Sequence, residues 1–573
     1  MASNYWNRWW TRPASRRRVL TSGGAAAAGL AGFALVGCGD DDDEPAGTAS
    51  PAGTGTAAAT ASATAQTAKP VAGGTYRYIG GPIGGLLDPH RTNTPFESGV
   101  IWHWAGNFLV RFNIDTGLPE PDLAQAMPEV ASDGTDLTFK IRPDAKFQNK
   151  APVNGRTVSA EDVKLTFERI KGLGAKSPRS GNYANVDTIT AVDATTLKFK
   201  LKAPQADLLN VMSDQYELVL PKEISSRGEE AVQKPEDVVG SGPYELVSYQ
   251  AGAGFEMKKR ADGYWKKDVA WVDGNKYTHQ PDNQAKANAL KAGEVDATDL
   301  PVDLVKQFDK DPKYTIVSAP NPTRECLLIN HTKERYKDPR IRQAIWRAID
   351  RKQVYDKVFA GAGIPGGPMS PAAKSWVLPE AELAKMPGFG TRAQELAEAK
   401  KLLAAAGVPD GFEETITTVT AFQADLLNDV FVGNLAEIGI KLKTENIGND
   451  FSVFLQREIR GEYNLASTLF LSGPYPDAQL LIYHHTTKGS RNYGKFGSAE
   501  LDAKLEKQAT LYDTKARQAL VFEIQRDIIN NPGPAWAGSR IGFGVASSTL
   551  QNVKASPFAA GYNPAENYWF KKA

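Results

Sequence analysis

The stretch Asp338-Pro339-Arg340-Ile341-Arg342-Gln343-Ala344 predicts the beginning of an α-helix. Asp338 is a favoured N-cap residue, and Pro339 suits the first turn, where the backbone N–H has no helical partner. Apolar side chains then recur at helical spacing, at Ile341, Ala344, Ile345, Ala348 and Ile349. The apolar run Cys326-Leu327-Leu328-Ile329, just before the helix, is typical of a buried strand with an inert thiol. A strand followed by a helix is therefore the local pattern.

Strands and helices alternate in the same way outward from this stretch. Residues 74–79 end at Gly80-Gly81-Pro82, and residues 137–141 and 197–201 alternate apolar with polar side chains, as half-buried strands do. Helices are predicted from the caps Ser159, Ser498 and Asp513, and over residues 394–406 before Gly407. The sequence predicts an α/β fold with several sheets.

Length and composition restrict the function classes. At 573 residues the chain is too long for one hydrophobic core, so two or more lobes are expected. A net charge of +1 gives no reason to expect a nucleic-acid partner. Two cysteines cannot form a disulfide framework. His484 and His485 are adjacent and therefore point in different directions, and the other histidines are scattered, so neither a metal nor another cofactor is predicted.

The first 38 residues have the features of an export signal. Five arginines, Arg8, Arg12, Arg16, Arg17 and Arg18, precede an Ala/Gly/Leu stretch over residues 23–36, which is too short to span a membrane. Ser15-Arg16-Arg17-Arg18-Val19-Leu20 resembles the twin-arginine signal. Leu35-Val36-Gly37-Cys38 resembles the lipobox of bacterial lipoproteins, in which the cysteine is acylated. We therefore expect a protein anchored by lipid at Cys38 on the extracytoplasmic face of the cell membrane.

Residues 39–70 are acidic at first and then rich in Ala, Thr, Gly, Ser and Pro. Such a segment cannot bury enough apolar surface to offset the entropy cost of ordering, so it is predicted to be a disordered tether.

Several sequence blocks follow one another over residues 71–545. They include Gly73-Gly74-Thr75-Tyr76, Leu87-Asp88-Pro89-His90, Leu123-Ala124 through Arg142, Ser159-Ala160-Glu161-Asp162-Val163, Gly240-Ser241-Gly242-Pro243-Tyr244, Tyr264-Trp265, Leu290 to Asp296, and the stretch from Asp338. Together they resemble the extracytoplasmic solute-binding proteins of peptide/nickel/oligosaccharide ABC importers, the family 5 class that includes oligopeptide- and dipeptide-binding proteins.

The resemblance implies a two-lobed periplasmic-binding-protein clamp of type II (cluster C) with an extra inserted domain. Lobe I would comprise residues 71–111, 238–326 and 540–573, the inserted domain residues 112–237, and lobe II residues 327–539. The chain would be the substrate-binding component of an importer. It would capture a peptide, oligosaccharide or similar small solute between the lobes and deliver it to a permease as a monomer.

The resemblance also indicates candidate ligand-binding residues. Peptide-binding members carry an aspartate for the peptide's N-terminal ammonium, and Ser472 occupies the corresponding position here. Ser472 and Tyr475 would offer neutral hydrogen bonds and a stacking face, which argues against a free amine, while Asp477 would hold the loop. Asn492-Tyr493 resembles a cleft-lining pair, with a structural turn as the alternative. Trp102 and Trp104 flank His103 and are cleft candidates, with core packing as the alternative.

Two rival functions remain open. A secreted, tethered hydrolase would show a nucleophile motif, but the chain has neither Gly-x-Ser-x-Gly nor His-Glu-x-x-His. Carboxylate-pair glycosidase chemistry stays open, because two acidic residues distant in sequence can meet in the fold. A binding protein that serves a sensor instead of an importer would have the same fold. We predict a binding protein and not an enzyme.

Overall fold

The computed structural model describes residues 69–81, 83–92, 99–470, 473–556 and 565–571. Residues Met1–Lys69 and Pro70–Ala573 form separate units, and the following concerns the second. The export signal, Cys38, residues 39–68 of the tether and Ser472 fall outside the described residues, so the predictions made for them stay predictions.

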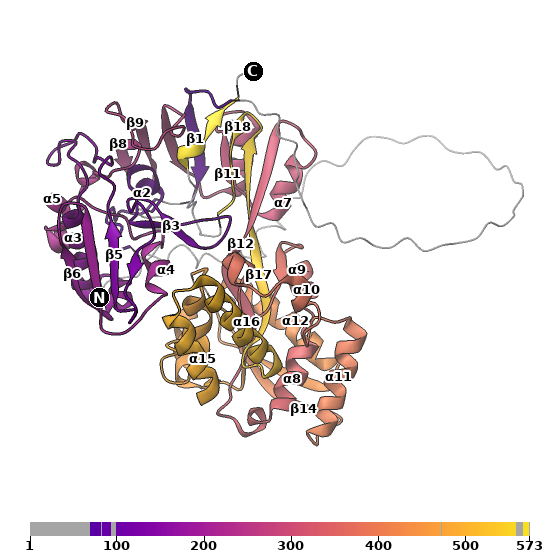
Figure 1. The fold of residues 1–573 in the computed structure, drawn as a ribbon. Coiled ribbons are helices and arrows are strands. Elements are labelled where there is room, and N and C mark those ends of the chain that lie inside the picture. The colour runs from indigo at the N-terminus through magenta and orange to yellow at the C-terminus, as the bar shows by residue number, and fades with distance from the viewer. Residues whose placement is uncertain (1–68, 82, 93–98, 471–472, 557–564, 572–573) are drawn as a thin grey trace, which may run out of the picture. The chain divides into compact units, whose positions relative to one another are not determined.

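A mixed eleven-stranded sheet organises the folded unit (Figure 1). Its order is β15-β14-β16-β12-β17-β11-β1-β10-β9-β8, and β13 pairs with β17 off this path. The bounds are β1 Thr75–Gly80, β8 Tyr244–Gln250, β9 Gly254–Lys259, β10 Gly274–His279, β11 Ala297–Asp299, β12 Tyr314–Ile329, β13 Gly363–Pro365, β14 Phe412–Thr418, β15 Ile440–Asn446, β16 Leu465–Phe470 and β17 Ala535–Ser547.

Strands β12 and β17 are long and run antiparallel beside each other from Tyr314↔Ser547 to Leu327↔Ala535. One half of the pair neighbours β11 and the other half neighbours β16. The register shifts between Pro320 and Arg324, in the middle of the pair. The predicted boundaries at 326/327 and 539/540 fall inside these shared strands, and the division into lobes stays a prediction.

Three smaller sheets accompany the large one. A four-stranded antiparallel sheet has the order β4-β5-β7-β6, and two further sheets are pairs. The bounds are β4 Glu129–Val130, β5 Asp136–Lys140, β6 Val186–Ala191 and β7 Thr196–Leu201 in the first, and β2 Val110–Phe112 with β3 Pro119–Pro121 and β18 Leu550–Gln551 with β19 Trp569–Phe570 in the others.

The helices lie between these strands along the chain. Their bounds are α2 Val100–Ala105, α3 Ala160–Gly172, α4 Leu208–Met212, α5 Lys222–Ser225, α6 Asn283–Lys291, α7 Val302–Val305, α8 Pro339–Ala348, α9 Arg351–Val358, α10 Glu380–Leu383, α11 Arg392–Ala405, α12 Ala424–Ala436, α13 Phe451–Arg460, α14 Ile482–His484, α15 Ala499–Thr510 and α16 Thr514–Asn530. Short 3₁₀ turns include Pro371–Trp376 and Ala565–Asn567, and a π-helical turn spans Asp477–Leu481.

The local rules used on the sequence account for most of these boundaries. Ser159 and Asp162 form a capping box, and Asp338 and Asp513 accept backbone N–H groups at their helix starts. The helix predicted over residues 394–406 is confirmed but begins two residues earlier, because Thr391 caps it and pairs with Gln394. Cys326 is fully buried in β12, and burial raises the pKa of its thiol well above the ordinary value. The predicted α/β class is confirmed.

Two large hydrophobic cores flank the shared strands. The first core packs β1, β5, β7, α2 and α3, and the second packs α8, α9, α12, β14 and β16. Trp536 of β17 and Cys326 of β12 belong to the second core, whereas Ala546, near the other end of β17, belongs to the first. The two strands therefore connect the cores directly.

Candidate functional site

An aromatic pocket of about 340 Å³ lies where β12 and β17 meet the strands of the first core. We call it the aromatic pocket. Side chains from β1, β10, β11, α2 and the segment after β18 contribute to its wall; the residues used below are Tyr76, Tyr78, Trp104, Asn275, Tyr277, Thr298, Asp299 and Tyr568. A concave, mainly apolar cavity with a few polar groups is the usual form of a small-molecule site.

The aromatic rings of this pocket hold one another in place. Trp104 stacks on Tyr76 with ring centroids 5.7 Å apart, and Tyr568 meets Tyr76 edge-on at 5.2 Å. Tyr78 and Tyr277 pack at 5.4 Å. Such pairs are stabilised beyond the area they bury, and they have few rotatable bonds. The wall is therefore formed before a ligand arrives.

Most polar groups of the aromatic pocket already have partners. The Tyr78 hydroxyl donates to Asp299 Oδ1 at 3.0 Å, and Lys286 Nζ donates to Asp299 Oδ2 at 3.1 Å. Burial and the Asp299 charge raise the pKa of Tyr78 well above its ordinary value, so the hydroxyl stays protonated. Asn275 is 2% exposed, and its Oδ1 has no hydrogen-bond partner among the described residues. That oxygen would accept a hydrogen bond from a ligand.

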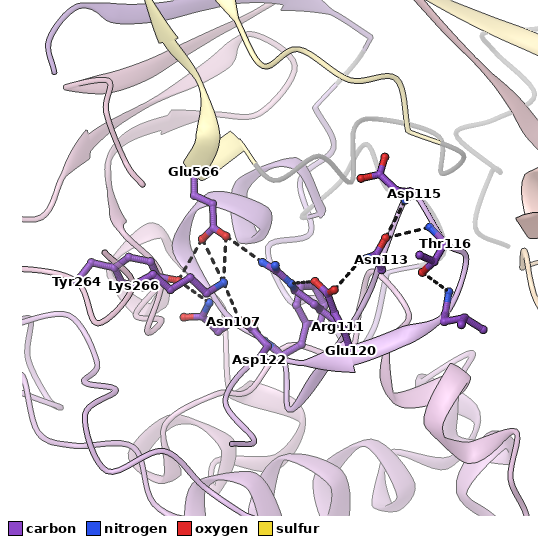
Figure 2. Close-up of polar contacts among 12 residues, drawn as sticks. Asn107, Arg111, Asn113, Asp115, Thr116, Glu120, Asp122, Tyr264, Lys266 and Glu566 are labelled. Carbon is purple, nitrogen blue, oxygen red and sulfur yellow. Dashed lines mark hydrogen bonds and ion pairs between the residues drawn. The ribbon is translucent and has the colours of Figure 1, made fainter. Parts of the chain in front are cut away.

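A second cavity, of about 180 Å³, is lined by charged side chains, and we call it the charged pocket (Figure 2). Glu566, in the turn Ala565–Asn567, lies between Arg111 Nη1 at 2.9 Å and Lys266 Nζ at 3.0 Å. Arg111 also pairs with Glu120 at 2.6 Å, and Lys266 with Asp122 at 2.9 Å. Figure 2 shows these side chains converging from β2, β3 and the C-terminal turn. The network holds the C-terminal segment against the first core.

The Asp122 carboxylate shows the balance of forces in this network. Burial would raise its pKa, but Lys266 and Arg111 together lower it more, and the net shift is downward. It also accepts the backbone N–H of Phe108 at 2.9 Å. The charged pocket therefore contains satisfied ion pairs.

The block Gly240-Ser241-Gly242-Pro243-Tyr244 is explained by a close approach to α2. A Cβ on Gly240 would lie 2.0 Å from the Ala105 carbonyl oxygen, and one on Gly242 would lie 2.6 Å from the Ala105 carbonyl carbon. Ser241 donates to Asn107 Oδ1 at 3.0 Å, and Asn107 donates to the Tyr264 hydroxyl at 2.8 Å. The blocks Gly240 to Tyr244 and Tyr264-Trp265 thus meet at the end of α2, the helix that carries Trp104.

The structure separates the two candidate tryptophans. Trp104 is 7% exposed and lines the aromatic pocket. Trp102 is completely buried in the first core, and its Nε1 donates to the Leu87 carbonyl at 2.8 Å. Helix α2 therefore presents one tryptophan to the pocket and the other to the core.

Asn492 and Tyr493 lie away from the aromatic pocket. The Asn492 side chain accepts the Phe496 backbone N–H at 3.0 Å and donates to the His485 carbonyl at 3.2 Å, which closes a turn. Tyr493 packs beside Phe470 at the end of β16, with ring centroids 6.0 Å apart.

Tyr475 and Asp477 face the segment that contains α4. Arg517 of α16 bonds to Asp207 Oδ1 at 2.7 Å and to Asp477 Oδ1 at 3.4 Å. Burial, followed by the charges of Asp214, Asp207 and Glu217, raises the pKa of Tyr475 well above its ordinary value. Burial, and then the charge of Asp207, also raises the pKa of Asp477. We call Asp207, Asp214, Glu217 and Asp477 the acidic cluster.

Several site residues were not predicted from the sequence. Tyr76 and Tyr78 belong to a predicted strand, and their alternation would have placed both on one face. No local sequence motif marks Asn275 as a site residue. Glu566 lies far along the chain from Arg111 and Lys266, so no local pattern could have paired it with them. Among the described residues, no group of three or more His, Cys, Asp or Glu side chains is arranged to hold a metal ion. Within the same described residues, no helix is long and apolar enough to cross a membrane.

Two hydrophobic cores joined by paired strands, with an aromatic pocket beside those strands, are the arrangement expected of a two-lobed solute-binding protein. Comparisons with known proteins agree. A family model described as bacterial extracellular solute-binding proteins, family 5 (middle region), matches residues 119–493. The chain therefore belongs to family 5 of the bacterial extracellular solute-binding proteins.

Individual relatives are distant. The glutathione-binding protein GsiB of Escherichia coli (strain K12) is 25% identical over 358 residues, which cover 62% of this chain and 66% of GsiB. The structure of HbpA2 from Haemophilus parasuis has a TM-score of 0.76 at 23% identity, over 87% of this chain and 100% of that one. A dipeptide-binding protein from Pseudoalteromonas sp. SM9913, solved with Met-Leu, has a TM-score of 0.64 at 22% identity, over 87% and 100%. These structures confirm the predicted two-lobed α/β fold.

Proposed function

We propose that this chain is the substrate-binding component of an ABC importer and that its ligand is a small peptide-like or similar solute held in the aromatic pocket. The observation that carries the proposal is the preformed wall of Trp104, Tyr76 and Tyr78 beside the shared strands β12 and β17. A pocket next to strands that link two lobes lies where lobe closure would bury a ligand. Family membership favours binding over the hydrolase alternative, because the family consists of solute-binding proteins.

The ligand class rests on the pocket and on the relatives. The related proteins include a glutathione-binding protein and peptide-binding proteins. The aromatic pocket of this chain offers ring faces for an apolar group and Asn275 Oδ1 for a hydrogen-bond donor. A peptide-like solute has both.

The test is native mass spectrometry of the chain purified from its own host, followed by thermal unfolding with and without the retained solute. A bound small molecule that raises the melting temperature and is recovered intact supports the proposal. Recovery of a hydrolysed product, or no stabilisation by any solute of the medium, would contradict it.

We also propose that the protein is exported through the twin-arginine signal and works as a monomer anchored by a lipid on Cys38. The support is the sequence pattern of residues 15–20 and 35–38. Metabolic labelling with a palmitate analogue should mark the membrane-bound wild type and leave Cys38→Ser unlabelled. Equal labelling of both would contradict the anchor, and a dimer in light scattering would contradict the monomer.

A further inference from the structure

Asn275 of β10 places a complete side-chain amide in the wall of the aromatic pocket. The residue is 2% exposed, and its side chain lines the pocket. Neither its Oδ1 nor its Nδ2 has a hydrogen-bond partner among the described residues. A buried amide without partners is destabilising, and native proteins leave few of them. The pocket therefore keeps one donor and one adjacent acceptor for a ligand.

The amide of Asn275 lies on the same face of the large sheet as the aromatic rings. Strands β1 and β10 pair in parallel, with Tyr76 beside Asn275 and Tyr78 beside Tyr277. Side chains two positions apart on a strand point to the same face, and all four of these line the aromatic pocket. A ligand bonded to Asn275 would therefore also contact ring faces.

These rings form a continuous row along the sheet. Phe255 stacks on Tyr277 with ring centroids 5.2 Å apart and an interplanar angle of 13°. Tyr277 lies 5.4 Å from Tyr78, and Tyr78 lies 6.1 Å from Tyr76, on which Trp104 stacks. Such a row favours a flat ring or an aromatic group of the ligand, which gains contact area by stacking.

The charged side chains of the aromatic pocket already have partners of opposite charge. Among the described lining residues they are Asp299, which accepts from Lys286, and Lys554, which pairs with Asp115 at 2.6 Å. An ionised ligand group in the pocket would lose its hydration without gaining a matching charge, which is costly. The pocket therefore favours an uncharged group.

Two hydroxyls of the wall are also used within the protein. The Tyr277 hydroxyl donates to the Gly81 carbonyl at 3.0 Å, and Thr298 Oγ1 donates to the Ile79 carbonyl at 2.8 Å. The wall is otherwise mainly apolar. A sugar, with a hydroxyl on most of its ring carbons, would leave many of these groups without partners. A ligand with few polar groups fits better.

We propose that Asn275 pairs with the amide edge of an uncharged cyclic amide, such as a cyclic dipeptide, whose apolar part lies on the row of rings. The proposal rests on the proposed solute-binding function and names the ligand class. A small ring forces its amide bond into the cis form, so that the N–H and C=O lie side by side. Asn275 Oδ1 accepts the N–H while Nδ2 donates to the C=O. In the trans amide of a linear peptide these two groups point in opposite directions, so one such amide cannot form both bonds.

The experiment uses three uncharged compounds that share a phenylalanine side chain. They are cyclo(Gly-Phe), its N,N′-dimethyl derivative without donors, and linear N-acetyl-phenylalanine N-methylamide with trans amides. Calorimetric titration of the full chain compares the wild type, Asn275→Ala and a matched control, Asn182→Ala, which changes an exposed amide in the turn Ser180–Tyr183. We expect the wild type and the control to bind cyclo(Gly-Phe) at least about tenfold more tightly than the other two compounds, and Asn275→Ala to lose this preference.

A second readout separates binding from a structural role. Because the Asn275 side chain has no partner in the protein, ligand-free Asn275→Ala should melt within about 2 °C of the wild type in scanning calorimetry. A larger loss would show that the amide is bonded within the protein, and would overturn the proposal. Asn275→Leu, of similar size, provides a second variant for the titrations if Asn275→Ala does not fold.

The titrations can overturn the proposal in three ways: no binding of cyclo(Gly-Phe), equal affinity of the wild type for all three compounds, or an unchanged preference in Asn275→Ala. Native mass spectrometry distinguishes this result from failure of the proposed function. A retained linear or ionised solute that stabilises the protein would contradict the cyclic amide and leave the solute-binding function intact.

Discussion

The aromatic pocket and the acidic cluster differ in how far their polar groups are satisfied within the protein. In the pocket, Asp299 accepts from both Tyr78 and Lys286, the rings pack on one another, and Asn275 Oδ1 is an acceptor left for a ligand. In the cluster, neither oxygen of Glu217 has a hydrogen-bond partner among the described residues. The pocket is complete in shape without a ligand, whereas the cluster is electrostatically incomplete.

This difference assigns different tasks to the two regions. A preformed apolar wall supplies contact area at little entropy cost, but it discriminates weakly between ligands of similar shape. Buried acceptors without donors are destabilising, because nothing replaces the hydrogen bonds to water that they lose on folding. We therefore expect mutations of the rings in the aromatic pocket to change affinity for all ligands, and mutations in the acidic cluster to change the stability of the protein and its pH dependence.

The largest effect should come from Trp104→Leu, which removes the stacked ring from the pocket wall. Loss of a central aromatic anchor costs about 2–3 kcal/mol, so affinity should fall about 30- to 150-fold. Trp265→Leu is the control, because Trp265 packs under Arg142 at 4.1 Å and does not line the aromatic pocket. Calorimetric titration with the retained ligand measures both. An equal loss in the two variants would mean that the pocket wall has no special role.

The second effect concerns stability and pH at the acidic cluster. Burial raises the pKa of Glu217 to about 8, whereas the unfolded value is near 4.5. Between these values the folded state keeps a proton that the unfolded state loses, so this group lowers stability as pH rises to about 8. Arg179, Asp214, Tyr183 and Tyr475 are the titratable or charged groups that face it.

Glu217→Gln removes this titration. The ligand-free variant should melt higher than the wild type by about 1–3 °C at pH 8, and equally at pH 4. Differential scanning calorimetry at the two pH values makes the measurement, with Glu129→Gln as control. A lower melting temperature of Glu217→Gln at pH 8 would show that Glu217 is charged and paired in the free protein, which would remove the contrast between the two regions.

The fold was predictable wherever a local rule decides a boundary. The capping box of Ser159 and Asp162 and the cap at Asp338 each depend on residues within one helical turn. Blocks such as Gly240-Ser241-Gly242-Pro243-Tyr244 indicated the family, although the reason for the glycines, contact with Ala105, appears only in three dimensions.

The candidate site was less predictable, because its members come from distant parts of the chain. Trp104 was singled out together with Trp102, and sequence alone could not say which one faces the pocket. No sequence pattern connects Asp214 with Tyr475, and their proximity depends on how two distant segments of the chain pack. Local sequence patterns determine helices and strands, whereas the acidic cluster results from the tertiary packing of distant segments.

A smaller effect should come from Tyr78→Phe, which removes one hydroxyl and keeps the ring. The bond from the Tyr78 hydroxyl to Asp299 Oδ1 lies within the protein, so its loss should lower the free energy of unfolding by about 1 kcal/mol. Affinity should fall by no more than about fivefold, through the altered polar edge of the pocket wall. Tyr249→Phe is the matched control, because the Tyr249 hydroxyl bonds to the Gly84 carbonyl outside the pocket. Titration with the retained ligand should show a change only in the first variant, and a change in both would mean that these hydroxyls act through general stability.

The smallest effect on ligand binding is expected from Glu566→Gln in the charged pocket. Its carboxylate joins Arg111 and Lys266, and both cations keep a second carboxylate partner, Glu120 or Asp122. Because the remaining pairs stay intact, stability should fall by only about 1 kcal/mol. Affinity for the retained ligand should stay within about twofold, since Glu566 does not line the aromatic pocket. Limited proteolysis should cut the C-terminal segment faster in the variant. If affinity instead fell as far as in Trp104→Leu, the charged pocket would be part of the binding site together with the aromatic pocket.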